Sequence, residues 1–232
     1  MENKPLSVVM LGASGAVGGQ ALGALLEMSN IAKITLLGRR TIPGITSEYA
    51  AIEQHVVDIH QVDSYSRLLN GHDVAICTLG VGEPSKMNRE DFVKIDKTAV
   101  ADFGQACKQA GIEHFELLSS VGADAASSSF YLRTKGELNN YLKGLIFKRL
   151  SIFQPSMILT PTNRYGITQA IVLKLWPMIN PLLIAGMSKY KGVKVEDLGR
   201  AMALNVFHPY QKVEELHYAD FQKILRMRSA LY

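Results

Sequence analysis

Tyr131 and Lys135 stand four residues apart in a stretch with helical character. On a helix, residues at this spacing project from the same face, so the Lys135 ammonium can stand beside the Tyr131 phenol. A nearby positive charge favours the ionised phenolate, and a tyrosine in that setting can exchange a proton with a substrate oxygen. The pair therefore predicts acid–base chemistry on an oxygen atom.

Two serines end an apolar run that precedes this pair in the chain. Ser120 is the expected catalytic partner, because its hydroxyl can donate a hydrogen bond to the oxygen that takes the proton, and Ser119 is the alternative. The same four-residue spacing recurs in Tyr190 and Lys194, but Gly192 interrupts that pair and no serine-bearing strand precedes it. We assign the second pair a structural role.

Three glycines follow the first apolar run, 6–11, at the spacing GxxGxxG and open an apolar helix over 17–28. Gly12 permits a tight turn, Gly15 lets backbone N–H groups approach a phosphate, and Gly18 lets the helix lie close to the strand. The helix N-terminus adds partial positive charge. Strand, glycine turn and helix in this order predict a dinucleotide site, with an ordinary glycine-rich turn as the alternative.

Arg39 and Arg40 follow the next apolar strand, 34–38. An acidic residue at this place would accept a hydrogen bond from the ribose 2′-OH of NAD and would repel a 2′-phosphate. Two guanidinium groups instead suit a phosphate, and one of them can stack on adenine. We therefore expect NADPH rather than NADH as the cofactor, with a solvated basic strand end as the alternative.

Apolar strands and amphipathic helices alternate through the first two thirds of the chain. The expected strands are 6–11, 34–38, 54–59, 74–80, 114–120 and 150–155, and the expected helices are 17–28, 62–69, 88–111 and 131–143. This alternation predicts an α/β fold with a doubly wound parallel sheet and right-handed crossovers. Ligands bind beyond the carboxyl ends of the strands in such sheets, so we expect the site there.

Residues 157–232 lose this regular alternation and contain short helices, such as 195–206, between prolines. We expect them to form a small C-terminal helical cap on the substrate side, within a single domain that spans 1–232.

The composition is that of an ordinary globular protein, with 47% hydrophobic and 20% charged residues and a net charge of +4 that is scattered along the chain. It favours no nucleic-acid partner. Cys77 and Cys107 indicate a reducing compartment, and the N-terminus lacks a cleavable apolar segment, so we expect cytoplasmic residence.

The apolar stretch 166–187 is interrupted by Lys174 and prolines, which argues against stable membrane insertion. It is interpreted as core or pocket lining, with a dimer or membrane-surface patch as the alternative. The histidines show no metal-ligand spacing, so no metal site is expected.

Five segments carry a family resemblance. They are Gly-Ala-Ser-Gly-Ala-Val-Gly at 12–18, Leu-Leu-Gly-Arg-Arg at 36–40, Gly-His-Asp-Val at 71–74, His-Phe-Glu-Leu-Leu-Ser-Ser-Val-Gly-Ala-Asp at 114–124, and Tyr-Leu-Arg-Thr-Lys-Gly-Glu at 131–137. In this order they resemble the atypical short-chain dehydrogenase/reductases, specifically the HIV Tat-interacting-protein-like oxidoreductases. The resemblance implies an NADPH-binding Rossmann domain with Ser120, Tyr131 and Lys135 as the catalytic set.

The loop geometry and the resemblance together define the residues expected at the cofactor. They are Gly12, Ser14, Gly15, Ala16, Val17, Gly18, Arg39, Arg40, Asp58, Thr78, Leu79, Gly80, Tyr131, Lys135 and Pro155. Two segments depart from the family pattern. Gln-Pro-Ser at 154–156 stands where Arg-Pro-Gly is expected, and Cys-Thr-Leu-Gly at 77–80 replaces the Asn-Asn-Ala-Gly of typical short-chain dehydrogenases.

Three functions are consistent with these features. The first is an NADPH-dependent carbonyl reductase that acts on a small-molecule substrate. The second is an NADPH-binding regulatory protein that engages protein partners, or a second copy of itself, with little turnover. The third, which the short cap disfavours, is a nucleotide-sugar epimerase or dehydratase.

Overall fold

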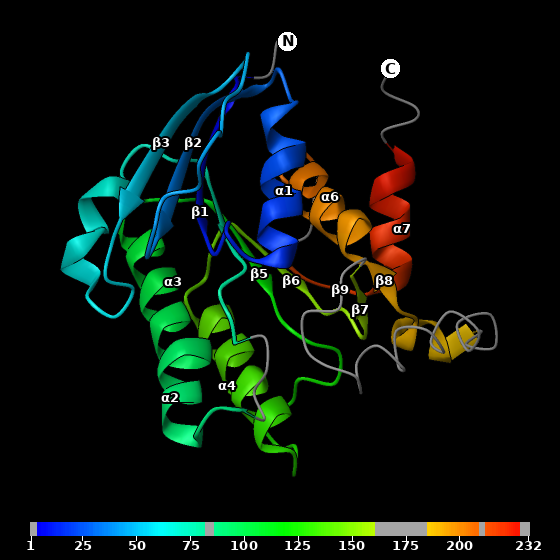
Figure 1. The fold of residues 1–232 in the computed structure, drawn as a ribbon. Helices are drawn as coiled ribbons and strands as arrows, with labels where there is room; N and C mark the ends of the chain where they lie inside the picture. Colours follow the sequence, from blue (N-terminus) through cyan, green and yellow to red (C-terminus); the bar gives the residue numbers. More distant parts are fainter. Residues whose placement is uncertain (1–3, 82–85, 161–184, 209–211, 228–232) are drawn as a thin grey trace.

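The computed structural model describes residues 4–81, 86–160, 185–208 and 212–227. A seven-stranded, wholly parallel sheet runs through the molecule in the order β3-β2-β1-β4-β5-β6-β9 (Figure 1). Its strands are β1 (Leu6–Leu11), β2 (Ile31–Gly38), β3 (Ala51–Val56), β4 (Val74–Cys77), β5 (His114–Leu118), β6 (Arg149–Phe153) and β9 (Val213–Leu216). The order reverses between β1 and β4, which is the switch point where a doubly wound sheet binds ligands. The predicted fold class is confirmed.

Helices cover both faces of the sheet (Figure 1). On one face lie α1 (Ala16–Leu26), α6 (Val195–Asn205) and α7 (Tyr218–Met227). On the other lie η1 (Val62–Ser64), η2 (Ser66–Leu69), α2 (Arg89–Val93), the π-helical turn η4 (Lys94–Ala99), α3 (Val100–Gln109) and α4 (Phe130–Gly144). This two-sided cover explains why the central strand β1 is apolar and buried without interruption from Val8 to Leu11. Val8 and Met10 pack into the first layer, whereas Val9 and Leu11 pack into the second.

The C-terminal residues are built into these layers to a greater extent than a cap would be. A short ribbon of β7 (Ile158–Leu159) and β8 (Val193–Lys194) follows β6, with the 3₁₀ segment η6 (Ala185–Tyr190) before β8. Helix α6 then packs against α1, and β9 adds a seventh strand beside β6. Strand β9 is not among the strands expected from the sequence. Most of the apolar stretch 166–187 lies outside the described residues.

Several strands end earlier than the sequence suggested. Strand β4 ends at Cys77, β5 at Leu118 and β6 at Phe153. Strand β3 covers Ala51–Val56 rather than 54–59. Residues 78–80, 119–120 and 154–155 therefore lie in loops past the carboxyl ends, where backbone and side chains can face a ligand instead of a neighbouring strand.

Cys77 and Cys107 are buried free thiols. Within the described ranges, none of the helices has the length and apolar character needed to cross a membrane. In the same part of the chain, no three His, Cys, Asp or Glu residues gather in a way that could hold a metal ion.

Candidate active site

The glycine loop lies between β1 and α1 and packs tightly on the loop that follows β4. Gly12 has a φ of +97°, and a Cβ atom there would stand 2.6 Å from the backbone N of Leu79. A Cβ atom on Gly18 would stand 2.3 Å from the Gly12 carbonyl oxygen. Gly15 is the N-cap of α1, whose first turn carries no acidic residue. The free N–H groups and dipole of this helix end therefore meet no negative charge of their own and suit a diphosphate.

Two cavities meet at Gly15 and Ala16. The first, of about 610 Å³, extends from the glycine loop along Gly19 and Gln20 to the segment after β2. Arg40 lines this cavity, whereas Arg39 does not. Of the two predicted arginines, the structure thus brings Arg40 to the glycine loop. The residues that line this cavity are Ala13, Ser14, Gly15, Ala16, Gly19, Gln20, Arg40, Thr41, Ile42 and Pro43.

Asp58 lies two residues past β3 and is exposed. Its Oδ1 atom accepts a hydrogen bond from the His60 backbone N–H at 2.9 Å. Asp58 lines neither cavity, so its expected place near adenine stays a prediction.

The second cavity, of about 320 Å³, lies between the carboxyl ends of β4 and β5 and the start of α4. It collects half of the predicted site residues, together with the alternative serine, Ser119, from four separate segments. They are Gly15, Ala16 and Val17 from α1 and its cap, Thr78, Leu79 and Gly80 after β4, Ser119 after β5, and Tyr131 and Lys135 from α4. The remaining residues of the wall are Val81, Asp96, Leu118, Ser156, Met157, Ile158 and Thr160.

Tyr131 and Lys135 share one helix, as the spacing predicted. Ser129 caps α4 by accepting a hydrogen bond from the Leu132 N–H, and Gly136 lets the helix approach the loop before it. A Cβ atom on Gly136 would stand 2.2 Å from the carbonyl carbon of Asp124. By contrast, Tyr190 belongs to η6 and Lys194 to β8, so the second pair of equal spacing shares no helix.

Of the two serines, Ser119 lines the cavity and Ser120 does not. The Ser119 hydroxyl donates to Asn139 Oδ1 at 2.9 Å, and Asn139 lies one turn beyond Lys135 on α4. The Ser120 hydroxyl instead donates to the Val121 carbonyl at 3.4 Å. The geometry therefore favours the alternative, Ser119, over Ser120.

Pro155 also lies outside the cavity wall, although the next residue, Ser156, is part of it. The Pro155 carbonyl accepts a hydrogen bond from the Val121 N–H at 2.9 Å, so this proline joins the loop after β5 to the loop after β6.

Asp96 is a site residue that the sequence analysis missed. Its Oδ1 atom lies 2.7 Å from Lys135 Nζ, and the two side chains are only 2% and 5% exposed. Burial by itself would lower the pKa of Lys135, but the charges of Asp96 and Tyr131 raise it above the ordinary value. The ammonium therefore stays charged inside the protein. A signal for Asp96 was present in the sequence, because it lies four residues after Phe92 and four residues before Val100. This spacing places Asp96 on the apolar face of the helix expected over 88–111.

Comparisons with known proteins agree with this geometry. The model of the NAD(P)H-binding family matches residues 12–149, which span the glycine loop, Tyr131 and Lys135. The chain belongs to this family. A rat relative, Protein HTATIP2, is 40% identical over 209 residues, which cover 90% of this chain and 84% of the rat protein. This NAD(P)H-binding protein is accordingly a member of the HIV Tat-interacting-protein-like branch of the atypical short-chain dehydrogenase/reductases.

A more distant sequence relative and two solved structures of similar fold were also found. Protein FMP52, mitochondrial, of Meyerozyma guilliermondii is 27% identical over 210 residues, which cover 90% of this chain and 89% of the fungal protein. The solved structure of MoeE5 with UDP-glucuronic acid and NAD has a TM-score of 0.70 at 15% identity and covers 97% of this chain and 82% of that one. The oxidoreductase ylbE of Lactococcus lactis has a TM-score of 0.66 at 17% identity, with 95% and 97% covered.

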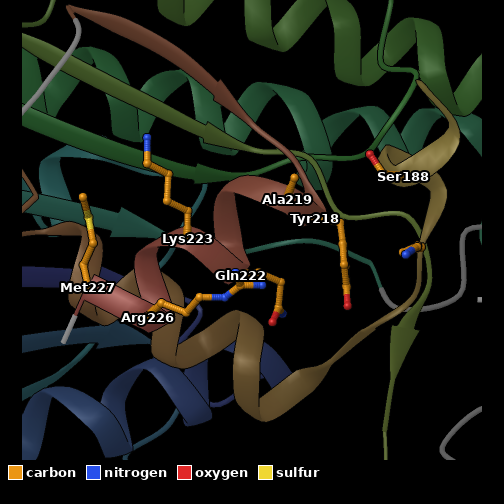
Figure 2. A pocket seen from close by; sticks show the side chains of 8 residues that line it. Ser188, Tyr218, Ala219, Gln222, Lys223, Arg226 and Met227 are labelled. Atoms are coloured by element: carbon orange, nitrogen blue, oxygen red, sulfur yellow. The ribbon is translucent and has the colours of Figure 1, made fainter. Parts of the chain in front are cut away.

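A third cavity of this NAD(P)H-binding protein, of about 520 Å³, lies along α7 (Figure 2). Lys191, Lys223 and Arg226 make it basic, and Lys191 Nζ stands 5.8 Å from the centre of the Tyr218 ring. It shares no residue with the two cavities at the glycine loop, so it is not part of the candidate active site.

Proposed function

We propose that this protein is an NADPH-dependent oxidoreductase that reduces a small carbonyl compound. One observation carries the proposal: Tyr131, Lys135 and Ser119 line a single cavity that meets the glycine loop. A nicotinamide nucleotide laid across that loop would have room for its reactive end in the same cavity as the phenol. Cytoplasmic residence and a homodimeric or other protein partner stay predictions.

The side chains of the cavity have separate roles in carbonyl reduction. When bound, a reduced nicotinamide supplies the hydride. The Tyr131 hydroxyl donates the proton that the carbonyl oxygen needs, and the charged Lys135 stabilises the phenolate that remains. The wall around them is largely apolar, with Leu79 and Leu118 among its residues, which suits a small apolar substrate.

Ser119 can orient the carbonyl if its hydroxyl hydrogen is released from Asn139. The Asn139 Nδ2 atom is buried and has no hydrogen-bond partner. A half-turn of the Asn139 amide would let Nδ2 donate to Ser119 Oγ, and the Ser119 hydroxyl could then donate to the substrate. Ser119 would in this way hold the carbonyl oxygen next to Tyr131.

The preference for NADPH over NADH rests on Arg40. Arg40 lines the cavity beside the glycine loop, and the described residues of that lining include no carboxylate that would repel a 2′-phosphate. Arg40→Ala should weaken NADPH binding by about tenfold or more, since a hydrogen bond to a charged group contributes about 1.5–3 kcal/mol. Arg39→Ala is the matched control and should change the dissociation constant much less. Equal affinities of the unmutated protein for NADPH and NADH would refute the preference.

Carbonyl reduction is tested with a panel of small aldehydes and ketones, with NADPH oxidation as the signal. Tyr131→Phe should lower the rate by about 10²- to 10⁴-fold and leave NADPH affinity unchanged. Tyr141→Phe is the control, because Tyr141 lies on the same helix but is 43% exposed and bonds to Gln105. Undiminished turnover in Tyr131→Phe would contradict the proposed role.

The same panel separates the competing functions. Rates at the uncatalysed background, together with capture of a protein partner that requires NADPH, would instead favour a regulatory role. A nucleotide-sugar epimerase would be indicated by NAD that stays bound through purification.

A further inference from the structure

Asp96 joins three segments at the candidate active site. It sits in the π-helical turn η4, and each of its carboxylate oxygens has a different partner. Oδ1 lies 2.7 Å from Lys135 Nζ on α4, whereas Oδ2 accepts the backbone N–H of Val81, after β4, at 2.6 Å. A Cβ atom on Gly80 would stand 3.1 Å from Asp96 Oδ1, so the loop after β4 passes directly over the ion pair.

The groups that face the Lys135 ammonium come from three elements. Asp96 approaches from η4, Tyr131 from the preceding turn of α4, and the Cys77 thiol from β4. Burial raises the pKa of the Cys77 thiol to about 12, so this group stays neutral at physiological pH. Of the two groups that face the ammonium from other elements, Asp96 and Cys77, only the carboxylate of Asp96 therefore carries a negative charge.

We propose that Asp96 is a positioning residue that holds the Lys135 ammonium and the loop at 78–81 together, and that its charge limits how strongly Lys135 promotes the ionisation of Tyr131. The proposal rests on the proposed function, because that function assigns Tyr131 its role. Asparagine at this position has one acceptor oxygen in place of two and carries no charge. Asp96→Asn should thus leave the ammonium uncompensated, and Tyr131 should lose its proton at lower pH.

The test follows tyrosinate absorbance during an alkaline titration. The chain contains 9 tyrosines, so each curve is corrected by subtracting the curve of the same protein with Tyr131→Phe. In Asp96→Asn the Tyr131 transition should move to lower pH by about one unit or more. The matched control is Glu137→Gln, which removes the Lys97–Glu137 ion pair between the same two segments, η4 and α4, at a half-buried place. The transition should not move in this control.

Superimposable Tyr131 transitions in Asp96→Asn and the unmutated protein would overturn the inference, and so would an equal shift in Glu137→Gln. If Asp96→Asn does not fold, Asp96→Ser is titrated in its place, because a hydroxyl carries no charge and can still accept a hydrogen bond from the Val81 N–H. The Tyr131 transition should again move to lower pH, and no shift would again overturn the inference. The titration needs no turnover, so it can be carried out on an inactive protein. Absence of activity would refute the proposed function, whereas the shift of the Tyr131 transition tests the role of Asp96 independently.

Discussion

Lys135 and Asp96 lie past the carboxyl ends of the strands, whereas Glu116 lies within the sheet on β5, and all three side chains are almost fully buried. Lys135 keeps its charge, because the Asp96 carboxylate is in contact with it. The basic side chain nearest to Glu116 in the described part of the chain is His114, with Nε2 3.6 Å from Oε1, but burial lowers the pKa of His114 well below its ordinary value and leaves the imidazole neutral. Burial of Glu116 raises the pKa of its carboxyl group to about 8, although the charge of Arg149 partly opposes this shift.

The surroundings of Glu116 show why it differs. Arg149 Nη2 donates to Glu214 Oε1 at 2.7 Å and to Asn205 Oδ1 at 2.8 Å. Asn205 in turn donates from Nδ2 to Glu116 Oε1 at 2.8 Å, and Glu116 Oε2 has no hydrogen-bond partner. Arg149 is thus engaged directly by Glu214, and Glu116 receives only an amide. A contact partner of opposite charge, rather than the depth of burial, decides which of these groups stays ionised.

The largest effect should follow from breaking the pair at the candidate site. Asp96→Ala should lower the free energy of unfolding by about 3–5 kcal/mol, because it leaves the Lys135 ammonium buried and unpaired. Chemical denaturation at neutral pH measures the change. The double variant Asp96→Ala/Lys135→Met removes both charges and should be clearly more stable than Asp96→Ala alone.

Loss of the half-buried Lys97–Glu137 pair gives the scale for this measurement. Glu137→Gln should cost at most about 1 kcal/mol, since solvent screens this pair. If Asp96→Ala lowered the free energy of unfolding no more than Glu137→Gln does, the conclusion that the Asp96 carboxylate compensates the buried Lys135 ammonium would be contradicted.

The next effect concerns the pH dependence of stability that Glu116 creates. Its pKa is about 8 in the folded protein and 4.5 as the reference value, so the folded state binds a proton that the unfolded state has released. Stability from this group therefore falls as the pH rises from 4.5 to 8. Glu116→Gln should remove the fall, and relative to the unmutated protein it should gain about 2–3 kcal/mol between pH 5.5 and 7.5.

Urea denaturation at several pH values measures the difference between the two proteins. Glu113→Gln is the control, because Glu113 is an exposed residue of the neighbouring turn that pairs with Lys148. The difference in the free energy of unfolding between Glu113→Gln and the unmutated protein should change little with pH. A constant difference for Glu116→Gln over the same range would show that Glu116 is ionised in the folded state.

The smallest effect belongs to a buried pair that carries no charge, Ser119 and Asn139. Asn139→Leu should lower the free energy of unfolding by about 1 kcal/mol, because a neutral hydrogen bond is lost while the volume is retained. The same variant should slow carbonyl reduction more than it weakens NADPH binding, since Ser119 loses the side chain that orients it. Steady-state kinetics measure the rate of carbonyl reduction, and a cofactor titration measures the dissociation constant of NADPH. An unchanged rate would remove Ser119 from the site.

Local patterns were sufficient to predict the parts of the site that one segment determines. Gly12, Gly15 and Gly18 are recognisable because the tight turn and close helix packing depend on their lack of a side chain. Tyr131 and Lys135 are recognisable because helical periodicity alone brings them to one face. The alternation of strands and helices likewise predicted the sheet, although not where each strand ends.

Contacts between distant segments could not be predicted in the same way. Asp96 stands 39 residues before Lys135, and its place on the apolar face of the expected helix 88–111 indicates burial but does not indicate which cation it contacts. Ser119 and Ser120 are adjacent, so a difference of one residue in where β5 ends decides which hydroxyl meets the cavity. Strand β9 is short and carries two glutamates, which makes it resemble a surface loop until β6 is seen beside it.

The central claim is that a nicotinamide nucleotide lies across the glycine loop with its reactive ring beside Tyr131. A crystal structure of the protein with NADP⁺ tests it most directly. We predict a diphosphate at the N-terminus of α1, the 2′-phosphate at Arg40, and the nicotinamide ring inside the cavity of about 320 Å³, facing the Tyr131 hydroxyl. A nicotinamide ring outside that cavity, or a Tyr131 hydroxyl turned away from the bound ring, would contradict the account.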